Sequence, residues 1–453
     1  DVVNNFKLRL SYGEVGNSNV SAFAYERMGT YVQSIWGTSL QTANIANPDL
    51  TWESTRSWNA GIDLNFFNNR VEFILDAYIK KTRNLLLQQD YPGYMGTTGN
   101  GAATAQWANI GSMENKGFEF TLNTVNISNR DFQWRTNVTF SLNRNKVASM
   151  NTENAFIDKT YQNSGQTEVI TRTAVGKPVS QFYGYKAIGR INSAADYLID
   201  NGDGTSTVKI ATPVLRVGDC VVNSGTDKGS LVKQIYVGDY IFEDLNNDGV
   251  IDEKDQTFLG SPLPKFTYGI NNTFNYKNFD LTIFLYGSHG NKAMNYLSRR
   301  ITNPNSSGNV HQSVANHARL GYLDGNSENT NVWNMYILPG SNGLCRMSVN
   351  DANDNDRISS RYVEDASFLR IQNIALGYTL PKKWLKKLKI ENARIYTNIK
   401  NVYTFTGYDG YDPEIGSTQA QYSYSGQNML MYGVDTGRCP SPRIYTFGID
   451  LTF

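Results

Sequence analysis

Residues 244–255, DLNNDGVIDEKD, have the side-chain types and spacing of a calcium-binding loop. Oxygen-bearing side chains stand at positions 1, 3, 5, 9 and 12, with glycine at position 6 and isoleucine at position 8, as in an EF-hand-type loop. Aspartate at position 12, where a bidentate glutamate is usual, favours a weaker site. The alternative is an Asx/Gly turn held by its own hydrogen bonds. The candidate ligands are Asp244, Asn246, Asp248, the Val250 carbonyl, Asp252 and Asp255.

The sequence has few residues or motifs that would support catalysis, zinc binding or nucleic-acid binding. The three histidines, His289, His311 and His317, and three widely separated cysteines match no zinc-site spacing. The motifs HExxH, GxSxG and GxxxxGK do not occur. A formal charge of +1 without a basic tract gives no electrostatic argument for nucleic-acid binding. The sequence therefore predicts a protein that is not an enzyme.

Strict alternation of apolar and polar residues is the dominant pattern along the chain. In residues 58–66, Trp58, Ile62 and Phe66 share one face with other apolar residues, whereas Asn59 and Asp63 lie on the other. The pattern predicts long strands at 6–12, 54–67, 70–82, 114–127, 131–143, 265–276, 278–288, 366–380, 392–405 and 443–453. A change of phase within 366–380 predicts a bulge near Asn373.

Strand length and connection length together favour a membrane barrel over a sandwich. Most of these strands run about 10–14 residues, where a tilted transmembrane strand needs about 9–11. Short turns alternate with long connections, which is typical of outer-membrane barrels with long extracellular loops. The sequence predicts an all-β, transmembrane antiparallel β-barrel, with apolar side chains facing lipid and polar ones facing a wet lumen. The expected extracellular loops are at about 13–53, 83–113, 144–264, 289–365 and 406–442.

Several stretches, in order, resemble one family. They include WESTRSWNAGIDLNFFNNR, NIGSMENKGFEFTLN, GKPVSQFYGYKAIG, GDYIFEDLNNDGVIDEKDQTFLGSPLPKF, YVEDASFLRIQNIALGYTLP, NVYTFTGYDGYDPE and PSPRIYTFGIDLTF. This series resembles the C-terminal part of SusC/RagA-type TonB-dependent transporters of Bacteroidota outer membranes. One departure is GRCPSPR, where Cys439 replaces the more usual aromatic residue before the proline.

The resemblance implies a barrel of about 22 strands, of which this chain supplies about ten C-terminal strands and neither the plug nor the TonB box. It implies active import of an oligomeric glycan or peptide, energised through TonB, with a SusD-like lipoprotein as a lid. It also implies an outer-membrane location and pairing of transporter and lid into a dimer of heterodimers. The alternatives are a passive or rim-active β-barrel, and a calcium-stapled secreted β-rich binding module.

The segment TGYDGYDPE, residues 406–414, contains the candidate substrate contacts Tyr408 and Tyr411. Tyrosine rings beside carboxylates can bind sugar rings. Packing against a neighbouring loop or the lid is the competing interpretation, and the sequence favours it. The sequence does not identify the substrate.

Overall fold

The computed structural model describes residues 2–18, 22–89, 106–152, 154–163, 166–224, 235–304, 308–341, 343–348, 351–386, 390–416 and 430–453. The other positions, including parts of the predicted connections at 13–53, 83–113, 144–264, 289–365 and 406–442, lie outside the described residues. In the described part of the chain, no helix is both long and apolar enough to cross a membrane.

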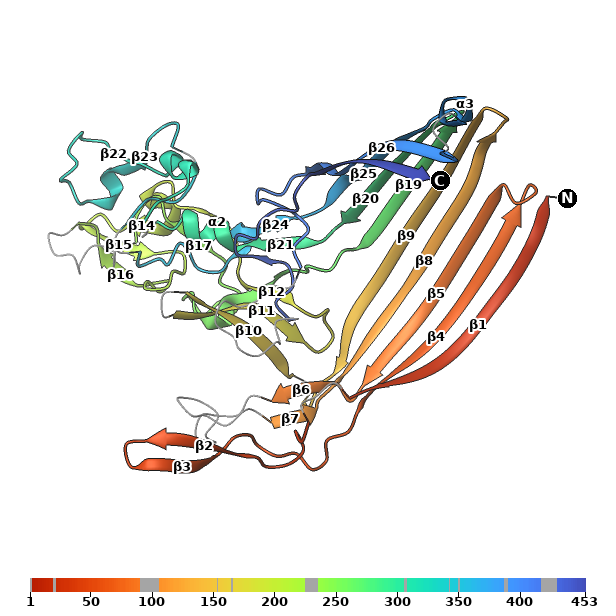
Figure 1. Ribbon diagram of the computed structural model, residues 1–453. Helices are drawn as coiled ribbons and strands as arrows, with labels where there is room; N and C mark the ends of the chain where they lie inside the picture. The colour runs from red at the N-terminus through yellow and green to blue at the C-terminus, as the bar shows by residue number, and fades with distance from the viewer. Residues whose placement is uncertain are drawn as a thin grey trace.

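Ten long antiparallel strands form a single curved sheet, in which neighbours follow one another along the chain (Figure 1). They are β1 (Val3–Asn17), β4 (Glu53–Phe66), β5 (Val71–Arg83), β8 (Ser112–Ser128), β9 (Phe132–Ser149), β19 (Phe266–Tyr276), β20 (Phe279–His289), β25 (Phe368–Thr379), β26 (Asn392–Thr406) and β28 (Ile444–Thr452). The predicted all-β barrel wall is confirmed, and it is a partial barrel: β1 and β28 are the two ends of the strand order.

The two ends of the sheet differ. Short turns at 67–70, 129–131 and 277–278, and the described part of the connection between β25 and β26, lie at one end, and the long connections lie at the other (Figure 1). At the first turn Phe67, Asn68 and Asn69 adopt positive φ angles of 55°, 54° and 62°. At the third turn, Lys277 has a φ of 52°. Asparagine tolerates this left-handed conformation better than most residues, which explains the tight reversal between β4 and β5.

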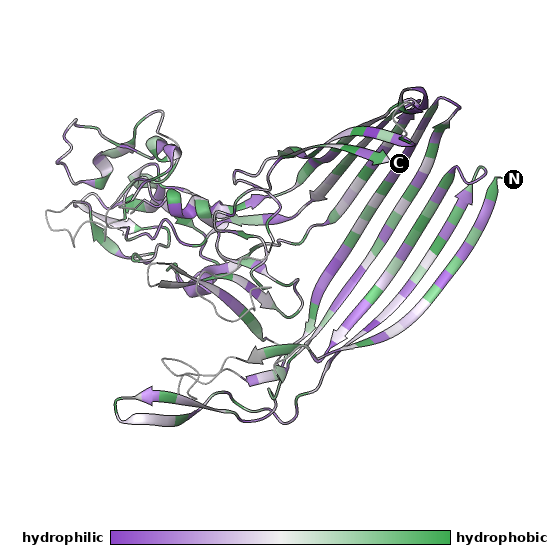
Figure 2. Ribbon diagram, viewed as in Figure 1, coloured by the Kyte–Doolittle hydropathy of each residue, from purple (hydrophilic) through white to green (hydrophobic). Residues whose placement is uncertain are grey.

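Strand pairing keeps the apolar residues of neighbouring strands on one face, and Figure 2 shows the resulting bands along the strands. Phe140 of β9 pairs with Phe120 of β8 and Tyr268 of β19. Its ring stacks against Phe118 and Phe266, with ring centroids 5.6 and 5.3 Å apart. A one-residue slip would turn every side chain to the opposite face, so this aromatic row fixes the register.

On the opposite face, polar side chains form ion pairs across the strands. The Arg9 guanidinium contacts Asp63 Oδ1 at 2.7 Å and Asp76 Oδ2 at 2.8 Å. Arg9 reaches the second carboxylate by passing over Gly61, where a Cβ atom would come within 2.7 Å of the guanidinium. Glycine at this position therefore permits a three-strand charge bridge on the face that turns away from lipid.

One predicted bulge is present, and two strands extend beyond their predicted ends. The register shifts between Ile371 and Asn373, at the predicted bulge. The first and fifth strands are longer than predicted, since they run to Asn17 and Ser149. Pairing continues there beyond the apolar alternation, as in the pair Lys146 with Glu114. Outside the lipid, strands can be polar on both faces, so alternation does not reveal where they end.

The long connections fold into small sheets. A four-stranded sheet consists of β10 (Phe156–Asn163), β11 (Gln166–Ala174), β12 (Gln181–Tyr185) and β18 (Gln256–Gly260). Two three-stranded sheets consist of β14 (Leu198–Asp200), β15 (Thr205–Val208) and β16 (Cys220–Val222), and of β24 (Val363–Asp365), β21 (Lys292–Asn295) and β27 (Val434–Asp435). Four strand pairs are β2 (Gly29–Ser34) with β3 (Gly37–Thr42), β6 (Leu86–Gln89) with β7 (Gln106–Asn109), β13 (Ala187–Arg190) with β17 (Tyr240–Phe242), and β22 (Leu320–Tyr322) with β23 (Met335–Ile337).

Short helical turns complete these connections. They are α1 (Ala194–Tyr197), α2 (Tyr296–Ile301), α3 (Lys382–Leu385) and the 3-10 turns η3 (Glu253–Asp255), η4 (Gln312–Asn316), η5 (Val332–Asn334) and η6 (Ser360–Tyr362). The long connections bury apolar cores of their own. One core surrounds Tyr197 and Leu215, and a second surrounds Phe182, Met294 and Tyr296. We call the folded parts of the two longest connections, 150–265 and 290–367, the loop layer.

Candidate functional site

The loop at 244–255 closes on itself through side-chain oxygens that accept backbone N–H bonds. Asp244 Oδ2 accepts from Gly249 at 2.9 Å, Asn246 Oδ1 from Asp248 at 3.0 Å, and Asp248 Oδ1 from Val250 at 3.1 Å. The hydrogen bond from the Asn246 amide is the largest cause that lowers the pKa of Asp248, and the bond from Val250 adds to it. The bonds accepted by Asn246 and Asp248 are Asx turns, which the sequence left open as the alternative to a calcium site.

Asp255 joins the two ends of this loop. Its side chain is fully buried and accepts from the N–H groups of Leu245 at 2.9 Å and Asp252 at 2.8 Å. Asp252 in turn caps η3 by accepting from Lys254 N at 2.8 Å. Asp255 therefore serves as an internal clamp, and both its carboxylate oxygens are engaged.

The donor set has two features that bear on calcium. Asp244 Oδ1 is buried and has no hydrogen-bond partner among the described residues, so one carboxylate oxygen of this loop is unengaged. Lys254 Nζ lies 3.5 Å from Asp248 and 3.3 Å from Asp252, where its ammonium group partly offsets the negative charge. The described residues contain no group of three or more His, Cys, Asp or Glu side chains placed to hold a metal ion. Calcium binding here stays a prediction.

The two tyrosines proposed as substrate contacts are placed differently. Tyr408 is buried, and its hydroxyl donates to Asp435 Oδ2 at 2.8 Å. Burial is the largest cause that raises the pKa of Tyr408, and the bond to Asp435 adds to it. Tyr411 is 67% exposed. The structure therefore gives Tyr408 a packing contact and leaves Tyr411 accessible.

Arg370 of β25 anchors the segment that contains both tyrosines. Its guanidinium is 3% exposed and contacts Asp412 at 2.5 Å and Glu414 at 2.8 Å. Its Nε donates to Thr404 of β26 at 2.9 Å. Asp412 and Glu414 of this segment are thus held against the barrel wall.

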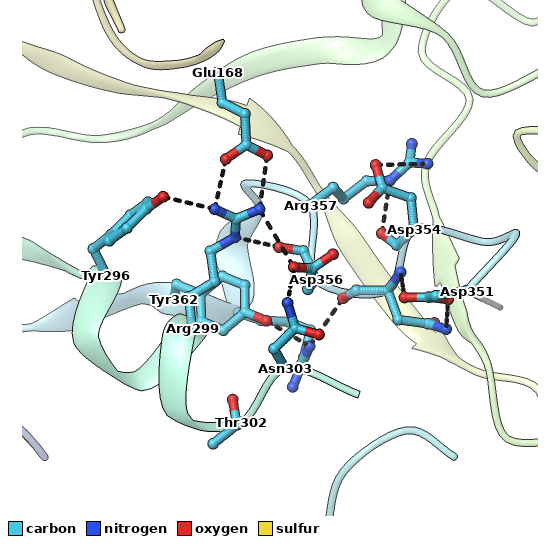
Figure 3. Close-up of polar contacts among 12 residues, drawn as sticks. Glu168, Tyr296, Arg299, Thr302, Asn303, Asp351, Asp354, Asp356, Arg357 and Tyr362 are labelled. Atoms are coloured by element: carbon cyan, nitrogen blue, oxygen red, sulfur yellow. Dashed lines mark hydrogen bonds and ion pairs between the residues drawn. The ribbon is translucent and has the colours of Figure 1, made fainter. Parts of the chain in front are cut away.

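Sequence reasoning missed a buried polar cluster in the loop layer. Arg299 of α2 is 4% exposed, and its two Nη atoms contact the carboxylate of Glu168 on β11 at 2.5 and 2.7 Å. Arg299 also lies 3.5 Å from Asp356 Oδ2 and donates to Tyr296 Oη at 2.9 Å. Figure 3 shows Arg299 between Glu168 and Asp356. The contact partners lie 131 and 57 positions apart along the chain, and the one local signal was the run DANDNDR at 351–357.

Comparisons with known proteins support the same architecture. The profile of the β-barrel of TonB-dependent receptor-like proteins matches residues 1–213. TonB-dependent receptor P3 of Formosa agariphila is 30% identical over the whole chain, and TonB-dependent receptor SusC of Bacteroides thetaiotaomicron is 26% identical over the whole chain. The chain spans 40% and 38% of the lengths of these relatives.

Solved structures show the same fold. The RagAB peptide importer in its closed-closed state matches with a TM-score of 0.69 at 21% identity, over the whole chain and 41% of the matched one. A second RagAB structure, of the peptide transporter, matches with a TM-score of 0.67 at 20% identity, over the whole chain and 41% of the matched one.

A curved antiparallel wall with one apolar and one polar face, short turns at one end and long folded connections at the other defines an outer-membrane β-barrel protein. The predicted location, the cell outer membrane, is confirmed. Within that class, residues 1–213 match the β-barrel of TonB-dependent receptor-like proteins, and the whole chain is similar to TonB-dependent receptors, SusC among them.

Proposed function

We propose that this chain forms the C-terminal part of the barrel of an active importer, which moves an oligomeric glycan or peptide across the outer membrane. The observation that carries the proposal is the similarity to TonB-dependent receptors along the whole chain. The polar inner face supports it, because a hydrated wall suits a hydrogen-bonding cargo.

The other components of the importer, namely the rest of the barrel, the plug, the TonB-contacting segment and the lid, are proposals as well. The rest of the barrel, a plug and a TonB-contacting segment would lie in the part of the protein that corresponds to the unmatched length of its relatives. A SusD-like surface lipoprotein would act as a lid, by analogy with the two-component name RagAB of the matched structures. Transporter and lid would pair into a dimer of heterodimers. Catalysis has no place in this mechanism.

Calcium, in this proposal, would be a structural ion of the loop layer and not a cargo. Asp244, Asn246 and Asp248 would face the ion together with the Val250 carbonyl, and Asp252 and Asp255 would complete the ring. The ion would replace the Lys254 ammonium as the charge that holds the carboxylates together.

The test is uptake by cells that lack the full-length receptor. Labelled neutral oligosaccharides and labelled oligopeptides, both above the porin size limit, are supplied separately. We expect uptake of one class to be lost in the deletion strain, to return with the full-length gene and to disappear again when TonB is deleted. Equal uptake of both classes with and without the receptor would show that the import proposal is wrong.

The same experiment separates the alternatives. Uptake that needs the receptor but not TonB would identify a passive barrel. Co-purification of a SusD-type lipoprotein with the tagged receptor is the expected result for the lid, and a receptor isolated without it from intact outer membranes would contradict the lid. A secreted binding module does not agree with the membrane-barrel fold and location described above.

A further inference from the structure

We propose that the two connections of the loop layer are held together by a buried, acid-rich clasp that tightens as the pH falls. The proposal is independent of which substrate is carried. The clasp consists of five acids and four arginines: Glu168, Asp239, Asp351, Asp354 and Asp356, with Arg299, Arg346, Arg357 and Arg361.

The first half of the clasp is the ion pair of Arg299 with Glu168, which joins the two connections. Glu168 belongs to the connection 150–265, and Arg299 and Asp356 belong to the connection 290–367. A single guanidinium therefore serves two carboxylates. Asn303 Nδ2, a neutral donor, donates to Asp356 Oδ2 at 2.5 Å, and Arg299 Nε donates to the Asp356 backbone carbonyl (Figure 3).

The second half is built on one amide. Asn355 Nδ2 donates to Asp351 Oδ1 at 2.6 Å and to Asp239 Oδ1 at 3.0 Å, so two carboxylates from different connections meet at one NH₂ group. Asn355 Oδ1 accepts from Tyr240 N at 2.8 Å. Asp239 is fully buried and pairs with Arg346 at 2.8 Å. Asp351 forms no ion pair with any described residue.

The charges of the clasp do not balance when every acid is ionised. Five carboxylates face four guanidiniums. The side chain of Asp354 is 56% exposed, so water screens its charge; of the other four acids, Asp351 has no guanidinium partner in the described part of the chain, and Asp356 shares one with Glu168. A buried charge without a partner is costly, so the arrangement favours proton uptake by an acid that lacks a full partner. Geometry singles out Asp351, which has hydrogen bonds only, and Asp356, which shares Arg299 with Glu168.

The pKa values agree with this reasoning. Burial raises the pKa of Asp351 to about 6, opposed by the hydrogen bonds from Asn355 and reinforced by Asp239. Burial likewise raises the pKa of Asp356 to about 6, opposed by Arg299 and reinforced by Asp354. Burial is also the largest cause that raises the pKa values of Glu168 and Asp239.

The sign follows from proton linkage. An aspartate has an ordinary pKa of 3.8, and the closed clasp raises this value for Asp351 and Asp356. The closed form therefore binds protons more tightly than an open form, in which the two connections have separated. The stability of the closed form relative to the open form increases as the pH falls through about 6. For two such groups, the ratio of open to closed form falls by roughly tenfold between pH 7.5 and pH 5.5.

Other ionisable groups also face the two acids, from every element packed against them. They are Glu168 of β11, Asp239 and Tyr240 at β17, Tyr296 and Arg299 of α2, Cys345, Arg346, and Asp354, Arg357, Arg361 and Tyr362 of their own segment. The arginines oppose proton uptake and the acids reinforce it. The test must therefore change the two aspartates alone.

The experiment is hydrogen–deuterium exchange of the full-length receptor in detergent at pH 7.5 and 5.5, corrected for the intrinsic pH dependence of exchange. In the parent, we expect peptides covering 351–362 and 166–174 to exchange roughly tenfold more slowly at pH 5.5. Asp351→Asn with Asp356→Asn should exchange slowly at both pH values, because asparagine resembles the protonated acid. Glu328→Gln, an exposed site in the same connection, and His311→Gln with His317→Gln should keep the parent's dependence.

The proposal fails if the parent shows no change in corrected exchange, or if the double variant retains the parent's ratio. If the double variant does not assemble, the single variants decide. Asp351→Asn and Asp356→Asn should each reduce the ratio to about three- to fourfold. A tenfold ratio in both single variants would overturn the clasp.

Discussion

At the scale of single residues, one guanidinium holds the segment that follows β26. Replacing Arg370 by methionine leaves Asp412, which is 14% exposed, without its cation. Removing one partner of a buried ion pair costs about 3–5 kcal/mol, and the half-exposed Glu414 keeps the cost near the lower end. We expect residues 407–416 to become protease-sensitive while the barrel stays folded. Arg370→Lys is the matched control, and its protease sensitivity should lie between that of the parent and that of the methionine variant. Equal protease resistance of the methionine variant and the parent would show that Arg370 does not anchor this segment.

The calcium prediction belongs to the same scale. With Asp244→Ala and Asp248→Ala, we expect calcium titration of the receptor to lose one site and protease to cut the loop at 244–255 faster. If calcium is bound, about 6–8 oxygens should surround it at about 2.3–2.6 Å. Asp203→Ala alters an exposed Asx turn elsewhere in the loop layer and should change neither result. Equal calcium binding and proteolysis in the double variant and the parent would leave only the turn.

Residue-level reasoning is limited to patterns that are local in the sequence. The Asx turns of Asn246 and Asp248 come from side chains that bond the backbone N–H two residues on, so twelve consecutive residues are enough to suggest them. The contact of Arg299 with Glu168 depends on how two long connections fold against each other. Sequence motifs relate residues that are close together in the chain, and these two residues are 131 positions apart. The cluster was therefore found only in the structure.

At the scale of elements, β9 offers a direct test of which face meets lipid. Phe140→Arg places a cation within the aromatic row formed with Phe118 and Phe266, and should cost about 2–4 kcal/mol if the position is near the bilayer centre. We expect impaired assembly and loss of heat-modifiable migration on gels. Thr139→Arg, the adjacent residue on the polar face, should assemble normally. Normal assembly of the Phe140 variant would contradict the assigned topology.

The same periodicity explains which elements could be predicted. Each of the ten sheet strands is lipid-exposed on one face, so its residues must alternate and the sequence reveals it. The strands of the loop layer are short, as in β12 (Gln181–Tyr185), whose central three residues are all buried. Burial on both faces removes the alternation, so neither length nor period distinguished these strands from irregular loop.

At the scale of the whole molecule, Phe453 is a test of assembly. It directly follows β28 and is 82% exposed, as expected for an aromatic residue at the lipid boundary. We expect deletion of Phe453 to lower the amount of receptor that reaches the outer membrane, and Phe453→Trp to preserve it. Quantitative surface labelling is the measurement, and unchanged surface levels after deletion would refute the prediction.

The buried cores of the loop layer have a consequence for recognition. A surface made of unstructured loops loses conformational freedom each time something binds to it, and that loss weakens the complex. Here the connections are already ordered around Tyr197, Phe182 and Met294 when the chain folds. A molecule that binds this surface meets connections that are already folded, so less conformational entropy is lost on binding than with unstructured loops.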